Sequence, residues 1–276
     1  LRFCIGIDVR YQRLSVLPFQ KIRLAIVLLN ETHIWLMRRP IILNAAVTLL
    51  TTLEEQKRAD GMMSMRRQCE WLAGRALLRQ CLAYYTGRDG LALVFDKTES
   101  GKPALEIQDG PAFNLSHGPR WIACAVAKAE CIGIDIDSEA RRNRTDEIAA
   151  RYFHPLEQAE LSKASGELER KRVFFRQWTM KEAYIKAIGE TINSVCLHEL
   201  AFESVGGSAP QALFDLPAGN WQFMHRLFDG DHHLALACQR SQCDTVVDSK
   251  ANYRYWLWDA ATQSRHELTD EQLCTL

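Results

Sequence analysis

The order of the predicted elements in the first half of the chain returns in the second half. In the first half, a helical pattern that contains Trp71 ends at a glycine and leads through short strands to a strand at Trp121. In the second half, a helical pattern that contains Trp178 ends at a glycine and leads through strands to His233. Two such units are too few for a solenoid, so the repeat predicts an α+β fold of two similar halves. We expect these halves to be residues 1–129 and 130–276.

The clearest single element is a strand over Cys131–Asp137. Ile132, Ile134 and Ile136 alternate there with Gly133 and two aspartates, which predicts one face in a core. Apolar periodicity and flanking stop signals give the remaining elements. Helices are expected near residues 65–85, 144–153, 155–165 and 167–188, and strands near 22–29, 91–95, 113–115, 121–127, 221–228 and 233–238.

Composition excludes several classes of protein. Lys+Arg and Asp+Glu both number 34, so net charge indicates neither nucleic acid nor membrane as a partner. The apolar run Leu24–Leu29 is too short to span a bilayer, and we expect no signal peptide at the start of the sequence. Nine scattered cysteines without a CxxC pair indicate reduced thiols in a cytoplasmic protein rather than a disulfide framework or a zinc site.

Asp135 and Asp137 are two residues apart on the predicted strand, so both carboxylates leave the same face. A hard divalent cation between them would relieve their repulsion, and Mg²⁺ suits this arrangement because it prefers oxygen ligands. The alternative is an edge strand with a solvated polar face. The Asp-x-Asp pattern by itself favours that alternative.

Glu182 and Lys186 share one face of the helix around Trp178 because they are four residues apart. Lys181 lies about 100° around the same helix from Glu182. Taken alone, Glu182 and Lys186 also fit an ordinary surface ion pair.

Ser116 and His117 lie where a predicted strand ends in a glycine turn. Neighbouring side chains on a strand diverge, which argues against a nucleophile–base pair for hydrolysis. A hydroxyl, an imidazole and free N–H groups suit a phosphate, although turn formation alone also explains the motif. Cations near the first long helix matter only if they gather opposite the carboxylates; they are Lys57, Arg58, Arg66, Arg67, Arg75 and Lys102. A second basic cluster, Arg141–Arg144, is expected at the surface or at a partner.

Taken together and in order, these motifs resemble the Sfp-type 4′-phosphopantetheinyl transferases, the family that activates the carrier proteins of synthases. The likeness covers residues 53–189. Its most specific parts are Ile132–Asp137 and Trp178–Lys186, which are separated by the family's usual distance. Supporting matches are Trp71–Leu78, Gly101–Pro103, Phe113–His117 and Phe153–Glu157.

The resemblance implies a pseudo-twofold fold with the active site between the two α+β halves. It implies that Asp135, Asp137 and Glu182 hold Mg²⁺ against the pyrophosphate of coenzyme A. The resemblance further implies cofactor contacts from Lys57, Arg66 or Arg67, Lys102, Ser116, His117, Asp135, Lys181 and Lys186.

The implied reaction transfers the 4′-phosphopantetheine arm to a serine of an acyl carrier protein and releases 3′,5′-ADP. Glu182 would act as the general base and Lys186 would stabilise the developing charge. The carrier could belong to fatty-acid, polyketide, polyunsaturated-fatty-acid or nonribosomal-peptide synthesis, and we expect a monomer. The alternatives are a non-catalytic module that binds carrier proteins and a Mg²⁺-dependent phosphohydrolase that acts on nucleotides.

Two positions depart from the family pattern. Asp137 is one methylene shorter than the Glu that many relatives carry, so it is expected to reach the metal directly or through water. Glu70 stands where some relatives have a basic residue, four positions before the helix glycine. We expect Arg66 or Arg67, one turn earlier, to take its place.

Overall fold

The computed structural model describes residues 31–43, 45–97, 101–107, 110–141, 144–203, 209–240 and 252–276. The predicted strand at 22–29 lies outside these residues. The elements up to residue 127 are β1 (Glu31–Arg38), α2 (Ala45–Leu49), α3 (Leu53–Asp60), α4 (Met65–Thr86), a 3-10 turn (Gly90–Ala92), β2 (Phe95–Lys97), β3 (Pro103–Leu105), β4 (Ala112–His117) and β5 (Trp121–Ala127). The later elements are β6 (Cys131–Ser138), α5 (Thr145–Tyr152), α6 (Pro155–Lys163), α7 (Glu167–Ala187), a 3-10 turn (Leu197–Glu199), β7 (Phe202–Glu203), β8 (Gln211–Ala212), β9 (Asn220–Phe228), β10 (His232–Arg240), β11 (Asn252–Asp259), β12 (Ser264–Leu268) and α8 (Asp270–Cys274).

The same arrangement of strands occurs twice. In the first sheet β5 pairs antiparallel with both β1 and β4, and in the second sheet β10 pairs antiparallel with both β6 and β9. In each case a strand, a long helix and a hairpin follow one another along the chain: β1, α4, β4 and β5, then β6, α7, β9 and β10. The predicted α+β fold of two similar halves is therefore confirmed.

The end of the chain extends the first sheet. β11 pairs parallel with β1, and β12 pairs with β11, which gives the order β12-β11-β1-β5-β4. The first sheet thus contains strands from both predicted halves, and the boundary near residue 129 stays a prediction.

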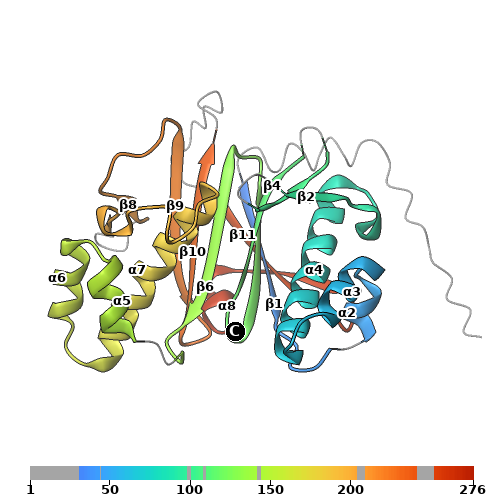
Figure 1. Cartoon of the computed structure of the whole chain (residues 1–276), viewed down its shortest axis with the longest axis horizontal. Coiled ribbons are helices and arrows are strands. Elements are labelled where there is room, and N and C mark those ends of the chain that lie inside the picture. Colours follow the sequence, from blue (N-terminus) through green and yellow to red (C-terminus); the bar gives the residue numbers. More distant parts are fainter. Residues whose placement is uncertain are drawn as a thin grey trace, which may run out of the picture.

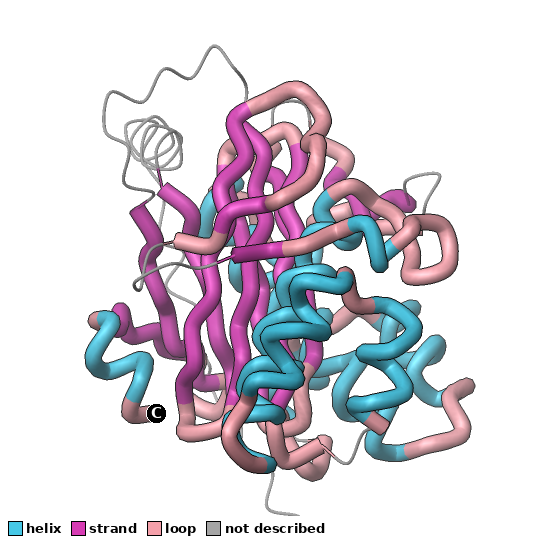
Figure 2. Tube along the Cα trace, turned by 90° about the vertical axis from the view of Figure 1, so that its left-hand side faces the viewer, coloured by secondary structure: helices cyan, strands magenta, loops and turns pink. Residues whose placement is uncertain are grey.

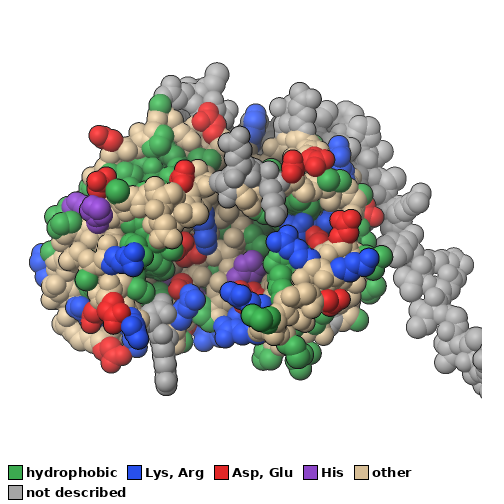
Figure 3. Space-filling view, in the orientation of Figure 1, with side chains coloured by type: hydrophobic (Ala, Val, Ile, Leu, Met, Phe, Trp, Pro, Cys, Tyr) green, Lys and Arg blue, Asp and Glu red, His purple; other side chains and the backbone are tan. Residues whose placement is uncertain are grey.

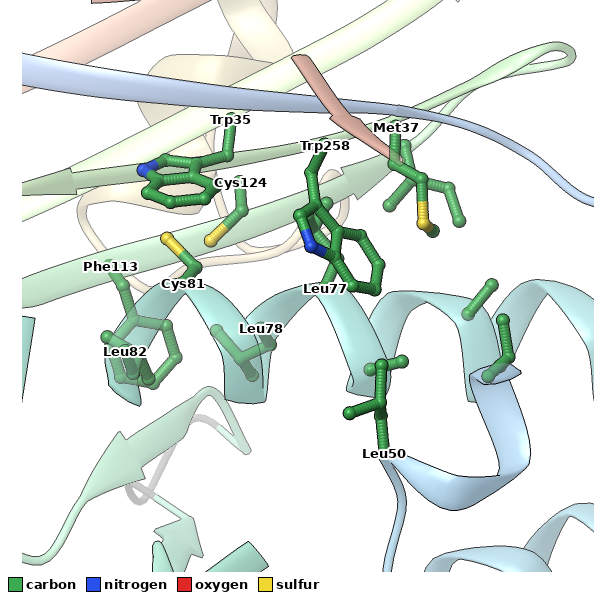
Figure 4. Close-up of a cluster of buried hydrophobic side chains, with 14 of the residues drawn as sticks. Trp35, Met37, Leu50, Leu77, Leu78, Cys81, Leu82, Phe113, Cys124 and Trp258 are labelled. Carbon is green, nitrogen blue, oxygen red and sulfur yellow. The ribbon is translucent and has the colours of Figure 1, made fainter. Parts of the chain in front are cut away.

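The two sheets pack face to face between the two long helices. Figure 1 shows the strands in the centre, with α2–α4 on one side and α5–α7 on the other. In the side view of Figure 2 the strands run next to one another and helices cover them. One buried cluster fills the space between α4 and the first sheet, and Figure 4 shows Cys81 of α4 pointing toward Cys124 of β5.

The alternation along β6 determines what each of its faces contacts. Ile132, Ile134 and Ile136 belong to the buried cluster between the sheets, as the sequence predicted. Gly133 lies on the other face, under α7. A Cβ atom on Gly133 would lie 2.0 Å from the carbonyl oxygen of Ala183 and 2.4 Å from the backbone nitrogen of Ala187. Only glycine allows α7 to lie this close to β6, and this close packing positions the side chains of α7 over the aspartates.

Replacing Gly133 with Ala is expected to lower the free energy of unfolding by at least the 1–3 kcal/mol or so that is typical of overpacking. The reason is that the clash is with backbone atoms, which cannot rotate away. Urea unfolding followed by circular dichroism measures the loss. Gly61→Ala is the matched control, since its Cβ would meet nothing closer than 3.6 Å. Equal unfolding midpoints for the two variants would contradict the packing argument.

The structure also bears on the state of the cysteines and on the expected absence of a membrane span. The described cysteines are all free thiols, and Cys69, Cys81, Cys124 and Cys238 are buried. Among the described helices, none combines the length and the apolar character that crossing a bilayer requires.

Candidate active site

A polar seam joins the two sheets where β4 meets β6. Asn114 and Ser116 are two residues apart on β4, so they project on the same side. The Asn114 Oδ1 atom accepts a hydrogen bond from the backbone N–H of Ile134 (2.9 Å), and the Ser116 Oγ atom accepts one from Ile136 (3.3 Å). Side chains rather than a backbone ladder therefore make these contacts, and polar groups of both halves are held together at this edge.

Three of the predicted residues meet at this seam. The Ser116 hydroxyl donates to Asp135 Oδ1 at 2.8 Å, and Lys186 Nζ approaches the same oxygen at 2.6 Å. Lys186 Nζ also lies 3.0 Å from Ser116 Oγ. Asp135 is nearly buried, so its charge is compensated by these two neighbours rather than by bulk water.

The other two predicted carboxylates lie close to Asp135. Asp137 accepts hydrogen bonds from the backbone N–H of Ser138 (2.9 Å) and from Arg141 (3.0 Å). Burial, together with the negative charges of Asp135 and Asp137, raises the pKa of Glu182 to about 7, although Lys186 opposes this shift. Burial also raises the pKa of Asp137. The charged forms of Glu182 and Asp137 are thus disfavoured beside Asp135, and a cation among the three carboxylates would reduce that cost.

The carboxylates do not form a complete metal cage. Among the described residues, no group of three His, Cys, Asp or Glu side chains is arranged to hold a metal ion by itself. Mg²⁺ commonly binds one or two carboxylates and takes its other ligands from water and phosphate. Asp135 and Glu182 fit a magnesium ion shared with a phosphate. Ser116 and Lys186 both contact Oδ1 of Asp135, whereas Ser138 and Arg141 engage both carboxylate oxygens of Asp137.

His117 points away from Ser116, as expected for neighbours on a strand. A Cβ atom on Gly74 of α4 would lie 2.3 Å from His117 Nε2, so the imidazole packs directly against the helix backbone. Within the described part of the chain, its Nε2 atom is buried and has no hydrogen-bond partner. Burial, together with the positive charges of Lys186 and Arg39, lowers the pKa of His117 to about 4. The imidazole is therefore neutral at pH 7.

A cleft of about 700 Å³ opens beside His117. It is bounded by α3, α4, the turn before β3 and the end of β4, and its lining includes Arg58, Trp71, Arg75, Lys102 and His117. In Figure 3 the surface is hollowed between the two halves, with a histidine in the hollow and Lys and Arg side chains around it. The lining also includes the carboxylates of Glu54, Glu55 and Asp96, and Glu55 pairs with Arg75 and Arg79. The cleft thus combines cations, carboxylates and aromatic rings, and its cations and rings suit a ligand that carries phosphates and a base.

The remaining predicted phosphate ligands differ in their placement. Lys57 is exposed on α3, while its neighbour Arg58 stacks on the Trp71 ring and lines the cleft. Arg66 and Arg67 are exposed in the first turn of α4. Lys102 lines the cleft, but its Nζ donates to the carbonyl oxygens of Ile132 (2.7 Å) and Lys186 (3.1 Å).

The structure does not bring Lys181 to the site. Its side chain is fully buried, forms an ion pair with Glu157 at 2.7 Å and donates to the carbonyl oxygens of Leu197 and Leu200. An ammonium group has three N–H donors, and these three acceptors use all of them. The geometry therefore argues against a phosphate-binding role for Lys181 and gives it a structural one.

Sequence comparisons show the family of the chain. The family described as the 4′-phosphopantetheinyl transferase superfamily matches residues 131–237, and the family described as 4′-phosphopantetheinyl transferase, N-terminal, matches residues 40–129. The 4′-phosphopantetheinyl transferase HetI of Nostoc sp. is 31% identical over 217 residues, which cover 75% of this chain and 87% of that protein. The chain belongs to the 4′-phosphopantetheinyl transferase superfamily.

A second relative and one solved structure complete the comparison. A 4′-phosphopantetheinyl transferase of Bacillus subtilis is 33% identical over 172 residues, covering 60% of this transferase and 71% of that protein. The structure of a holo-(acyl-carrier-protein) synthase from Bacillus anthracis in complex with CoA (3′,5′-ADP) covers 41% of this chain and 96% of its own, with a TM-score of 0.36 and 19% identity. The expected enzyme type, a phosphopantetheinyl transferase, is confirmed by the sequence relationships.

Sequence reasoning missed two polar residues near the site of this transferase. Asn114 had a detectable signal, because it stands two positions before Ser116 and so shares its side of β4. Arg39 had none: it follows β1, far from every motif in the sequence, and its guanidinium pairs with Glu70 at 3.1 Å. Arg141 was expected at the surface or at a partner contact, and the structure shows it exposed with one N–H on Asp137.

Proposed function

We propose that this transferase moves the 4′-phosphopantetheine arm of coenzyme A to a serine hydroxyl of an acyl or peptidyl carrier protein. The serine oxygen forms a bond to the phosphorus that carries the pantetheine arm. The bond between that phosphorus and the bridging diphosphate oxygen breaks, and 3′,5′-ADP leaves with the electron pair. The observation that best supports this reaction is the meeting of Asp135, Glu182 and Lys186 beside a cleft lined by cations.

Each residue at the seam has a role in this proposal. Glu182 accepts the proton of the attacking serine, since its carboxylate faces the same region as Asp135 and Lys186. Lys186 holds a phosphate oxygen and stabilises the charge that develops on it. Ser116 fixes the orientation of Asp135 through its 2.8 Å hydrogen bond.

The carboxylates fit a magnesium ion that is shared with the substrate. Asp135 and Glu182 would hold Mg²⁺, which would neutralise the charge of the diphosphate oxygens and of the leaving group. Asp137 supports this position through its charge, with Arg141 as its own counter-ion. We further propose a cytoplasmic location, because the described cysteines are free thiols, which suits a reducing compartment.

The test uses purified protein, coenzyme A, MgCl₂ and a panel of apo carrier proteins from the different synthase types. Mass spectrometry is expected to show a gain of one phosphopantetheine arm on at least one carrier, and EDTA is expected to stop the gain until excess Mg²⁺ is added. Loss of coenzyme A without any carrier would indicate a phosphohydrolase instead. Binding of a carrier with no mass gain under any metal condition would indicate a non-catalytic module.

A further inference from the structure

Arg39 lies at the end of β1 and contacts α4 through Glu70. Its backbone N–H donates to the carbonyl oxygen of Arg120 at 2.8 Å, which fixes the main chain, and its guanidinium lies 3.1 Å from the Glu70 carboxylate. The Arg39 side chain is only 17% exposed. An arginine has five N–H donors, so a carboxylate that takes one of them orients the group and leaves others for a second anion.

The sheet register places Arg39 on the same side as His117. Met37 of β1 pairs with Ile122 of β5, and Ile122 pairs with His117 of β4, so these three residues form one row across the sheet. Met37 and Ile122 belong to the buried cluster under α4. Arg39 is two positions beyond Met37 and therefore continues along that face.

The helix α4 brings the same two groups together from its own side. Glu70 and Gly74 are four residues apart on α4, so they share one face. Gly74 packs against the His117 ring, and Glu70 holds Arg39 one turn earlier. The positive charge of Arg39 acts on His117, together with that of Lys186. Two cations therefore act on an imidazole whose buried Nε2 atom has no hydrogen-bond partner among the described residues.

We propose that Arg39, held in place by Glu70, is a phosphate-binding residue of the transferase and binds a cofactor phosphate in the cleft beside His117. This inference rests on the proposed function for the identity of the ligand. A guanidinium can bind a carboxylate on one edge and a phosphate on another. Glu70 therefore positions Arg39 and leaves N–H donors of the guanidinium available for a phosphate. The role expected of Arg66 or Arg67 on α4 thus falls to an arginine that comes from β1.

The test measures coenzyme A binding by calorimetry in the absence of carrier protein, with wild type, R39A, R39K and R39A/E70R. Loss of a charge-assisted hydrogen bond is expected to weaken binding by R39A roughly ten- to a hundred-fold. R39K retains the charge and is expected to lose less. R39A/E70R presents a guanidinium from α4 at the same place and is expected to recover part of the affinity. R254A is the charge-matched control, because Arg254 lies on β11, away from β4, where it forms a 3.1 Å ion pair with Glu31 of β1.

Dephospho-coenzyme A identifies the phosphate: an R39A effect that disappears with it assigns Arg39 to the 3′-phosphate, and an unchanged effect assigns it to the diphosphate. Wild-type affinity in R39A overturns the proposal. A loss of affinity that R39K shares fully and that R39A/E70R does not recover also overturns it, because that pattern indicates a structural role alone.

All these results are measured as coenzyme A binding. An enzyme that binds coenzyme A but transfers nothing therefore contradicts the proposed function and leaves the Arg39 result standing. Failure of the wild type to bind coenzyme A overturns both.

Discussion

Glu182→Gln is expected to leave the fold intact and to lower the rate of arm transfer roughly 100- to 10,000-fold. Gln has nearly the same shape as Glu, but it cannot accept the serine proton and is a poorer ligand for Mg²⁺. The substitution also removes a charge that Asp135 and Asp137 repel, so the unfolding temperature should not fall. Single-turnover transfer to a carrier protein, followed by mass spectrometry, measures the rate.

Glu190→Gln is the matched control for this prediction. Glu190 is exposed just beyond the end of α7, and its loss changes the net charge by the same amount. We expect it to retain the wild-type transfer rate and coenzyme A affinity. A Glu182→Gln enzyme that transfers the arm at the wild-type rate would rule out Glu182 as the general base. A large drop in its unfolding temperature would instead assign Glu182 a structural role.

The residues that the sequence placed correctly are those whose position follows from local periodicity. The alternation along Cys131–Asp137 predicted which side of β6 is buried, and the i, i+4 spacing predicted that Glu182 and Lys186 share a face of α7. The divergence of Ser116 and His117 followed from the same geometry. These relations hold within a single element and need no knowledge of the tertiary fold.

Contacts between distant segments were beyond this reasoning. Residues 91–95 were expected to form a strand, but the segment starts as a 3-10 turn because Arg79 of α4 binds the carbonyl oxygens of Gly90 (2.6 Å) and Leu93 (3.0 Å). The parallel pairing of β11 with β1 joins residues more than 200 positions apart. The ion pair between Arg39 and Glu70 is of the same kind. Glu70 looked like a departure from the family pattern in the sequence, and the structure makes it the anchor of a cation from another element.

Lys181 belongs to the Trp178–Lys186 motif, but its side chain is buried and has a structural role. It forms a 2.7 Å ion pair with Glu157, and both side chains are almost completely shielded from solvent. Burial raises the pKa of Glu157 and lowers that of Lys181, so the attraction between them only partly offsets the loss of hydration. The pair therefore adds no net stability over an apolar pair of similar size, but each member depends strongly on the other.

Lys181→Met is accordingly expected to lower the free energy of unfolding by about 3–5 kcal/mol, because Glu157 keeps a buried charge without a counter-ion. Urea unfolding measures this loss. The double variant Lys181→Met/Glu157→Gln should recover much of this stability. Gln removes the charge and keeps a side-chain oxygen that can accept the hydrogen bond from the backbone N–H of His154, the N-cap residue of α6. The raised pKa of Glu157 also fixes the sign of the pH dependence. Protonation relieves the orphaned charge, so the deficit of Lys181→Met should be smallest below the ordinary Glu pKa of 4.5 and should grow as the pH rises.

Coenzyme A affinity separates this structural role from a phosphate-binding role for Lys181. At a temperature where Lys181→Met is still folded, its affinity should equal that of the wild type, because no N–H of Lys181 points into the cleft. A direct phosphate contact would give the opposite pattern, with weakened binding and no rescue by Glu157→Gln. The double variant is decisive, since it restores the stability of α6 and α7 without restoring any cation. Recovery of stability with unchanged affinity therefore assigns Lys181 to the buried pair, and the phosphates to the cations at the seam.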